Sequence, residues 1–322
     1  MEGLGASAIR DRAWWTAMAV AALAAAGWLR HPAVPYLVGG WAAIAVHHAR
    51  SRIADAPCPP ISRAPVSLVM TAPPHAARPR RLKELLPHEV AEILAHDPRL
   101  LVPVGTLEQH GPHLPLGCDT IIIEHIADDL SARFGILRAP TLEYGVNVVS
   151  ERQLPGNTSL RKKTLHRTLN DLLDAWEHAG VREFILMTSH AHDAHLEALA
   201  TVITAEARVR VVDVLAVRLD DLLDAQTEAM HGDEVDTSLM LYLAPELVRP
   251  ELAQDYMLAR DELRRYRRGW LKVPAASAGS IGRPSLASAQ KGRSIYERII
   301  ASLVDRVVEP GLQEGERAVV GG

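Results

Sequence analysis

The sequence predicts an α/β fold, a three-layer α/β/α arrangement in which helices cover both faces of a mostly parallel central sheet. Short apolar runs, typical of buried strands, alternate along the chain with segments whose apolar residues recur at helical spacing. Such alternation favours parallel strands, because each helix carries the chain back across the sheet before the next strand begins. With 322 residues, 48% of them hydrophobic, the chain can build one large or two small domains.

The first 52 residues are predicted to form an apolar helical hairpin that precedes this domain. The runs 13–29 and 32–46 contain no charged residue, and tryptophans lie near their ends, as at a membrane interface. Each run is slightly short for a membrane-spanning helix. Arginines flank the outer ends of the pair more than its turn, so a membrane-anchored hairpin would leave both termini in the cytoplasm. A cleaved signal peptide is the alternative for the first run.

Residues 53–81 are predicted to form a linker, because they are rich in proline and lack a core-forming pattern. Met70, inside this segment, is an alternative translation start that would remove the hairpin. We therefore expect the protein at the cytoplasmic face of the cell membrane, or in the cytoplasm if translation starts at Met70. The folded domain is predicted to occupy residues 82–315.

Within this domain, strands and helices are expected in a regular order. The apolar runs RLLVPV at 99–104 and EFILM at 183–187 are typical of buried strands. In the helix expected at 163–179, leucines and Trp176 recur at helical spacing, which places that tryptophan in the core. The remaining elements are expected as helices at 120–134 and 194–208 and strands at 136–142 and 209–217.

The loop after the first of these strands, EQHGPHLPLGCD at 108–119, concentrates side chains that bind metals. Glu108, His110 and Asp119 lie beyond the carboxyl end of a strand, where open α/β sheets place their ligands. Carboxylate oxygen and imidazole nitrogen are ligands for zinc, manganese and related divalent ions. The alternative is a polar loop whose histidines hydrogen-bond to the backbone.

A second cluster, TSHAHDAH at 188–195, follows the strand at 183–187. His190 and His192 are two positions apart, so in an extended loop their rings point the same way and can reach one ion or two neighbouring ions. Asp193 is suited to cap a helix whose positive amino end would lie beside the site. A histidine-rich surface turn is the alternative, but two such clusters after two strands favour a metal site.

Composition narrows the class of protein. A formal net charge of −4 gives no argument for a nucleic-acid partner. Cys58 and Cys118 are the two cysteines, so no disulfide framework is indicated and a reducing compartment fits. Residues 259–272 carry five arginines near Trp270. They could bind a phosphate or carboxylate, although the solvated face of a helix is the preferred interpretation.

The segment VPVGTLEQHGPHLPLGCD at 102–119 resembles the signature of the creatininase (creatinine amidohydrolase) family. Looser resemblances to the same family follow in order along the chain. They are LPGNTSL at 154–160, SHAHD at 189–193, HGDEVDTSLML at 231–241 and GSIGRPSLASAQKG at 279–292. The resemblance spans roughly residues 82–310 and leaves the amino-terminal quarter uncovered.

This resemblance implies a hydrolase with two metal ions. One ion would be held by Glu108, Asp119 and His190, and the other by His110, His192 and the bridging Asp119. A hydroxide between the ions would attack a carbonyl or amidine-like carbon of the substrate. His195, further along the second cluster, is the alternative to His192 as fifth ligand.

The resemblance also implies roles near residue 231. His231 matches the family's proton-handling histidine and would deliver a proton to the leaving nitrogen. Asp236 or Glu234 would orient that histidine or a metal ligand. The alternative for both acidic residues is stabilisation of a helix amino terminus, since VDTSLMLYL has a helical pattern.

The sequence departs from the family pattern at two points. His192 stands where the family commonly has a carboxylate or a glycine, and an imidazole in place of a carboxylate makes the site more positive by one charge. This change should lower the pKa of a bound water and favour zinc. Creatininase lines its pocket with tryptophans, whereas past residue 70 this chain has Trp176 and Trp270 alone, so we do not expect creatinine as the substrate.

The expected function is hydrolysis of a C–N bond in a small amide, cyclic amide or formamide by two divalent ions. Zinc is expected first, with manganese or iron as alternatives. The alternative functions are trimming of a short peptide by the same site, or metal binding without catalysis by a membrane-tethered protein. We expect a small-molecule amide partner, no nucleic acid, and membrane association through residues 13–46. The resemblance further implies a homo-oligomer, which is a hexamer in this family.

Overall fold

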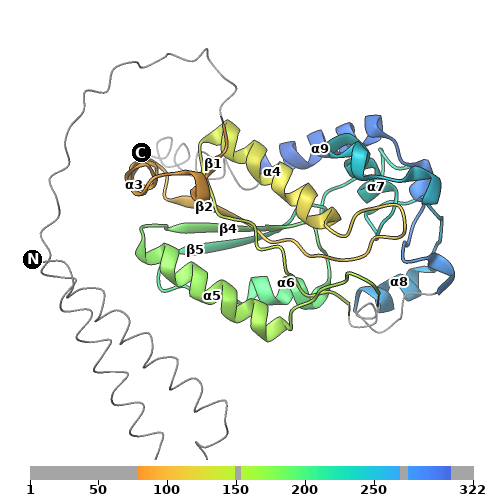
Figure 1. Ribbon diagram of the computed structural model, residues 1–322, viewed down its shortest axis with the longest axis horizontal. Coiled ribbons are helices and arrows are strands. Elements are labelled where there is room, and N and C mark those ends of the chain that lie inside the picture. The colour runs from red at the N-terminus through yellow and green to blue at the C-terminus, as the bar shows by residue number, and fades with distance from the viewer. Residues whose placement is uncertain (1–77, 149–153, 269–274, 306–322) are drawn as a thin grey trace, which may run out of the picture. The chain divides into compact units, whose positions relative to one another are not determined.

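The computed structural model describes residues 78–148, 154–268 and 275–305 (Figure 1). The predicted hairpin over residues 1–52, nearly all of the predicted linker and Trp270 lie outside these ranges. Inside them, no helix is both long enough and apolar enough to cross a membrane.

The described domain is built on one sheet of five strands in the order β1-β3-β2-β4-β5, and every neighbouring pair is parallel. The strands are β1 Arg80–Arg81, β2 Arg99–Pro103, β3 Leu137–Arg138, β4 Glu183–Thr188 and β5 Arg208–Asp213. β2 and β4 lie side by side, from Arg99 opposite Glu183 to Pro103 opposite Met187. The segments that leave these two strands therefore start next to each other at one edge of the sheet.

Helices cover both faces of the sheet, which confirms the predicted three-layer fold (Figure 1). They are α3 Pro87–His96, α4 Cys118–Phe134, α5 Lys162–His178, α6 Asp193–Ala200, α7 Glu234–Leu243 and α9 Ala289–Leu303. Helix α8 Arg260–Arg267 packs instead in a separate small cluster with Leu258 and Ile281. Along β2, Leu100 and Val102 join the core with α3, α5 and α6, whereas Leu101 joins the core with α4, α7 and α9. This division follows from the alternation of side chains along a strand.

In helix α5, leucines at helical spacing form one buried face. Leu165, Leu169 and Leu173 recur every four residues and are fully buried at 0% exposure, while Trp176 packs partly buried against the same core, as predicted. Replacing one of these leucines by alanine would cost about 2–5 kcal/mol through lost burial and the cavity that remains.

Several predicted boundaries were wrong. The helix expected at 194–208 ends at Ala200, because the buried Glu177 carboxylate of α5 accepts the N–H groups of residues 205–207 and turns this backbone away from the helix. The strand expected at 136–142 is Leu137–Arg138, and β5 ends at Asp213 rather than at residue 217. β1 lies at the last two residues of the range assigned to the linker.

Helices α7 and α9 approach each other at backbone distance. A Cβ atom added to Gly292 of α9 would lie 1.8 Å from the carbonyl oxygen of Ser238 in α7, so this position requires glycine. Beside this contact, Lys291 forms ion pairs with the buried Glu234 and, at 2.8 Å, with Asp224. The two helices therefore pack as one unit with the loop that precedes α7.

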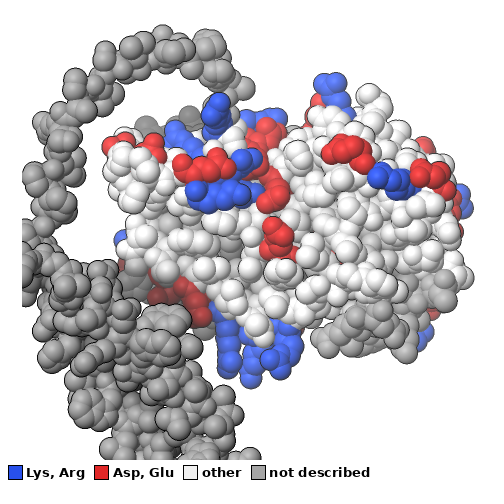
Figure 2. Space-filling model, viewed as in Figure 1, with Lys and Arg blue, Asp and Glu red and all other residues white. Residues whose placement is uncertain are grey.

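On the face shown in Figure 2, lysines and arginines lie in small groups beside aspartates and glutamates, and broad areas between them carry neither. Mixed charge of this kind matches the small formal net charge of the chain. This face presents no broad basic surface for a nucleic acid.

Candidate metal centre

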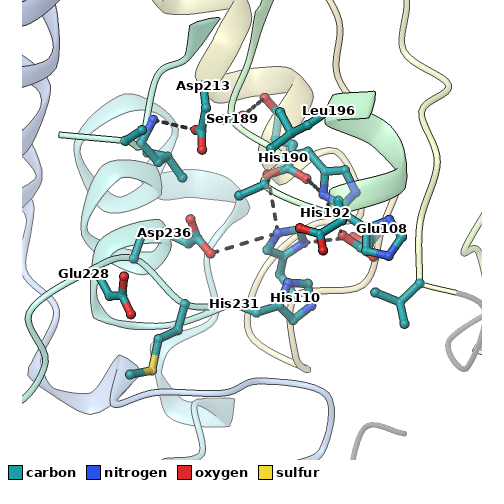
Figure 3. A pocket seen from close by; sticks show the side chains of 18 of the residues that line it. Glu108, His110, Ser189, His190, His192, Leu196, Asp213, Glu228, His231 and Asp236 are labelled. Atoms are coloured by element: carbon teal, nitrogen blue, oxygen red, sulfur yellow. Dashed lines mark hydrogen bonds and ion pairs between the residues drawn. The ribbon is translucent and has the colours of Figure 1, made fainter. Parts of the chain in front are cut away.

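The two predicted clusters meet at the carboxyl ends of β2 and β4. Glu108, His110 and Asp119 follow β2, and His190 and His192 follow β4 (Figure 3). All five side chains line one cavity of about 370 Å³. The hydroxyl of Ser189 also donates to the carbonyl oxygen of Asp119 over 2.9 Å and joins the two segments. The sheet thus brings together side chains from distant parts of the sequence.

Glu108, Asp119 and His190 converge most closely. Nδ1 of His190 lies 3.1 Å from a carboxylate oxygen of Glu108 and 3.3 Å from one of Asp119. All three residues are buried, and one ligand atom from each lies within 4.8 Å of the others. These three residues could hold the ion that the family resemblance implies for them.

A backbone carbonyl sets the orientation of His190. Nε2 of this ring lies 3.0 Å from the carbonyl oxygen of Val146, which can accept a hydrogen bond but cannot donate one. Glu108 and Asp119 raise the pKa of His190 and favour a charged ring. In the neutral ring that an ion would require, the proton would stay on Nε2 and the lone pair of Nδ1 would be directed toward Glu108 and Asp119. Histidine ligands of metals are commonly held in this way by a second partner.

His110 is arranged on the same principle. Its Nδ1 lies 3.1 Å from the carbonyl oxygen of Glu108, while Nε2 lies 3.5 Å from Asp119 and 4.0 Å from Asp236. Asp119 contacts the rings of both His110 and His190. Its role as a bridging carboxylate stays a prediction.

The charge balance of this cluster favours a cation. Both carboxylate oxygens of Glu108 and one of Asp119 are buried without a hydrogen-bond partner. Burial alone would lower the pKa of His110, but the nearby carboxylates, Asp119 first, raise it to about 10. Burial alone would raise the pKa of Glu108, but the neighbouring histidines, His190 first, lower it to about 2. Unpartnered buried carboxylates beside imidazole nitrogens fit divalent ions.

His192 lies at the same cavity but further from the carboxylates. Its Nδ1 is 3.1 Å from the carbonyl oxygen of Val146, which leaves Nε2 as the free ligand atom, and its ring centre lies 6.0 Å from that of His190. Among the described residues, the groups whose ligand atoms already converge do not include His192. Its role as a ligand stays a prediction.

His195, the alternative to His192, has other partners. Its Nδ1 accepts the N–H of Val146 over 3.2 Å, so Nε2 carries the proton and lies 3.1 Å from the hydroxyl oxygen of Thr188. Both ring nitrogens are therefore used inside the protein. His195 supports the backbone that orients His190 and His192.

His231 lies close to Glu108 and His110, which the spacing of the sequence does not indicate. Its ring centre is 4.3 Å from that of His110, and these three residues form a second group that could hold an ion. Nε2 of His231 is 2.7 Å from the carbonyl oxygen of Gln109. Burial, reinforced by His110, lowers the pKa of His231 to about 4.

The acidic residues at the start of α7 have three different roles. Asp233 caps the helix by accepting the N–H groups of Val235 and Asp236 over 2.9 and 3.0 Å, which sequence reasoning did not single out. Asp236 accepts the N–H of Gly232 and faces His110. Glu234 turns away to Lys291. Of the two acidic residues expected near the histidines, Asp236 alone lines the cavity.

From the arginine-rich segment at 259–272, no arginine with a described side chain lines the cavity. Arg264, Arg265 and Arg268 are exposed, as expected for the solvated face of a helix. From the same segment, Tyr266 is buried, lines the cavity and lies 5.9 Å from the His231 ring. Helical spacing alone did not single out this aromatic residue. Cys118 is fully buried at the start of α4.

Comparison with known proteins points to one family. A family model of creatininase, described as creatinine amidohydrolase, matches residues 83–307. The creatinine amidohydrolase of Pseudomonas putida is 27% identical over 241 residues, which cover 68% of this chain and 92% of that protein. The mycofactocin precursor peptide peptidase of Mycolicibacterium smegmatis is 29% identical over 217 residues, which cover 65% and 84% respectively.

Solved structures of creatininase share the fold. A manganese form is similar with a TM-score of 0.61 and 25% identity, over 72% of this chain and 98% of that chain. A zinc–zinc form of a creatininase mutant is similar with a TM-score of 0.60 and 26% identity, over the same 72% and 98%.

Proposed function

The chain belongs to the creatininase family of metal-dependent amidohydrolases, and from this premise we propose that it cleaves a C–N bond of a small amide, cyclic amide or formamide with two divalent ions. The observation that carries the proposal is the cluster of buried Glu108 and Asp119 oxygens, whose described polar neighbours are histidine ring nitrogens. Family members are hydrolases of amide bonds, so the non-catalytic alternative is set aside.

We assign one ion to Glu108, Asp119 and His190, and the other to His110, His192 and the shared Asp119. Three imidazoles and two carboxylates suit zinc first, and manganese or iron as alternatives. When bound, the ions supply an activated water and stabilise the negative charge that develops on the substrate oxygen.

The remaining residues of the cavity bind the substrate and move protons. His231, beside Glu108 and His110, is placed to pass a proton to the leaving nitrogen. Asp236 holds the loop at Gly232 and faces His110. The described wall beyond these groups combines apolar side chains with carboxylates. They are Leu196, Leu215, Val217, Met230 and the ring of Tyr266, and the acidic residues Asp193, Asp213 and Glu228. A cavity of about 370 Å³ suits a small substrate.

Trimming of a short peptide is the second candidate activity. Two observations favour it: the similarity to a precursor peptide peptidase, and the absence of tryptophan from the described wall of the cavity. The same ligands would serve either reaction, because both break an amide bond.

The test is metal analysis of the purified full-length chain, followed by a screen of amides, cyclic amides, formamides and short peptides. We expect about two ions per chain and turnover of at least one class, abolished by a chelator and restored by zinc or manganese. Asp129→Asn, at a partly exposed position of α4 that pairs with Arg133 outside the cavity, is the matched control for changes at Asp119. Two bound ions with no hydrolysis in any class would contradict the proposal.

Assembly and location stay predictions. The hexamer and the membrane association follow from the resemblance and from residues 13–46, and the latter lie outside the described part of the chain. Light scattering and membrane fractionation of the full-length protein measure them directly.

A further inference from the structure

The segment Gly279–Gly282 holds His231 through its backbone. The N–H of His231 donates to the carbonyl oxygen of Ile281 over 3.2 Å, and the N–H of Ile281 donates to the carbonyl oxygen of His231 over 2.7 Å. These two bonds form an isolated antiparallel bridge. These bonds therefore fix the main chain of His231 to this segment independently of any contact that its ring makes.

The same segment reaches the ring of His231 by a second path, through Gln109. Nε2 of Gln109 donates to the carbonyl oxygen of Gly279 over 3.0 Å, and its Oε1 accepts the N–H of Gly111 over 3.0 Å. The side-chain amide of Gln109 therefore joins the loop at 108–119 to Gly279. The carbonyl oxygen of Gln109 in turn lies 2.7 Å from Nε2 of His231.

This last contact decides which nitrogen of His231 carries the proton. A carbonyl oxygen only accepts, so the short contact requires hydrogen on Nε2. The amide nitrogen of Gln109 also lies 3.2 Å from the same Nε2 and would favour the opposite tautomer. The carbonyl contact is 0.5 Å shorter, and a lone pair facing this oxygen would be repelled. Nδ1 is then the unprotonated nitrogen, and no hydrogen bond within the described residues engages it.

We propose that Gln109 and Gly279 are positioning residues that hold His231 with its proton on Nε2 and leave Nδ1 to exchange the catalytic proton. The inference rests on the proposed function, in which His231 handles that proton. Neither residue is among those that line the cavity. Each acts through the His231 ring.

Gly279 is required by the Gln109 side chain. Its φ is +102°, and a Cβ atom there would lie 1.9 Å from Oε1 of Gln109. Any side chain at position 279 would therefore displace the amide that joins the two loops. Gly282 gives a matched comparison, because its φ is +133° but its Cβ would meet Asp233, at 2.4 Å, rather than Gln109.

Kinetics of the full-length, metal-loaded protein test the first part of the proposal. A general acid or base contributes about 10²–10⁴-fold, which His231→Ala should measure. Gln109→Ala should lower kcat by at least about tenfold within that limit, with KM and metal content unchanged, and should have no further effect in the His231→Ala background. An unchanged kcat, or a loss confined to KM or to metal content, would overturn the positioning role.

A double-mutant cycle tests the contact itself. Gly279→Ala should lower the melting temperature. This decrease should be smaller in the Gln109→Ala background, because the side-chain amide that the new Cβ atom would displace is absent. The cost of Gly282→Ala should be the same in both backgrounds. Additivity at both glycines would show that Gly279 does not act through Gln109.

A measurement without turnover separates this inference from the proposed function. Nitrogen NMR of the zinc-loaded, histidine-labelled protein, assigned with His231→Gln, should show hydrogen on Nε2 of His231 and none on Nδ1. Hydrogen on Nδ1, or zinc bound to it, would overturn the inference even in an active enzyme. If the NMR spectrum shows the expected tautomer but the protein cleaves no amide, the positioning role stands and the proposed function is contradicted.

Discussion

The carbonyl oxygen of Val146 lies 3.0 Å from Nε2 of His190 and accepts its proton. The same oxygen lies 3.1 Å from Nδ1 of His192, so one backbone group orients both histidines of the second cluster. The N–H of Val146 donates a hydrogen bond to Nδ1 of His195. The orientation of both histidines thus depends on the backbone of Val146, whose side chain packs in the core.

His195→Ala should weaken metal binding without removing a ligand. The buried N–H of Val146 would lose its partner, which costs about 1–3 kcal/mol of stability. Metal affinity should fall by roughly 10–100-fold, as when other outer partners of metal ligands are lost. Titration with zinc measures the change, and His178→Ala, at an exposed position, is the control. Complete loss of one ion would instead make His195 a ligand.

Asp119→Asn should reduce the occupancy of both ions, because Asp119 contacts both His110 and His190. The loss of affinity should exceed the roughly 10–100-fold cost of removing an outer partner. Metal content by mass spectrometry checks this outcome, with Asp129→Asn as control. Loss of one ion with full retention of the other would exclude the bridging role.

His192→Glu should retain two ions and move activity to higher pH. The added negative charge raises the pKa of the activated water, so the active form appears at higher pH than in the wild type. His192→Ala should weaken mainly one ion, since Glu108, Asp119 and His190 hold the other. Wild-type metal content and pH profile in both variants would show that His192 is not a ligand.

Glu177→Gln should lower the melting temperature at neutral pH. Hydrogen bonds from three backbone N–H groups, at Ala205 first, lower the pKa of Glu177. The ionised carboxylate therefore stabilises the folded state above its unfolded pKa of about 4.3, and this contribution is lost as the pH falls through the lower folded value. The difference between wild type and variant should narrow below about pH 4. Glu197→Gln, at an exposed ion pair, should show no such pattern.

Chelation should lower the melting temperature, and added zinc should restore it. A ligand at 100 times its Kd stabilises the folded state by about 2.7 kcal/mol. For a domain of this size that corresponds to roughly 5–10 °C. Calorimetry of the metal-loaded and chelated protein measures the shift. Equal melting temperatures of the metal-loaded and chelated protein would mean that no bound cation stabilises the folded domain.

The fold was predictable because its signals are local. Buried strands appear as apolar runs, and the carboxyl ends of parallel strands meet at one edge, which placed Glu108, His110, Asp119 and His190 together. The end of α6 was not predictable in this way. It depends on Glu177, a residue of a different helix. The expected strand at 136–142 was too long because Pro140 offers no N–H to a neighbouring strand.

The contacts of His231 could not be predicted from spacing. Gln109, His231 and Gly279 lie in three separate loops, and no periodicity links them. They meet because α7 and its preceding loop pack against the sheet and the Gly279–Gly282 segment pairs with residue 231. Family resemblance supplied a role for His231, and the structure supplied the groups that hold it.

The adjacency of β2 and β4 also determines when the site can appear during folding. The hydroxyl of Ser189 bonds to the carbonyl of Asp119 across a sequence separation of 70 residues, and the metal ligands are joined over similar distances. Parallel strands pair only after a crossover has closed, which is slow compared with the formation of local turns. In the unfolded chain, an ion would meet the clusters at 108–119 and 188–195 only as separate segments. The rate at which zinc binds during refolding should therefore report the rate at which β2 and β4 pair.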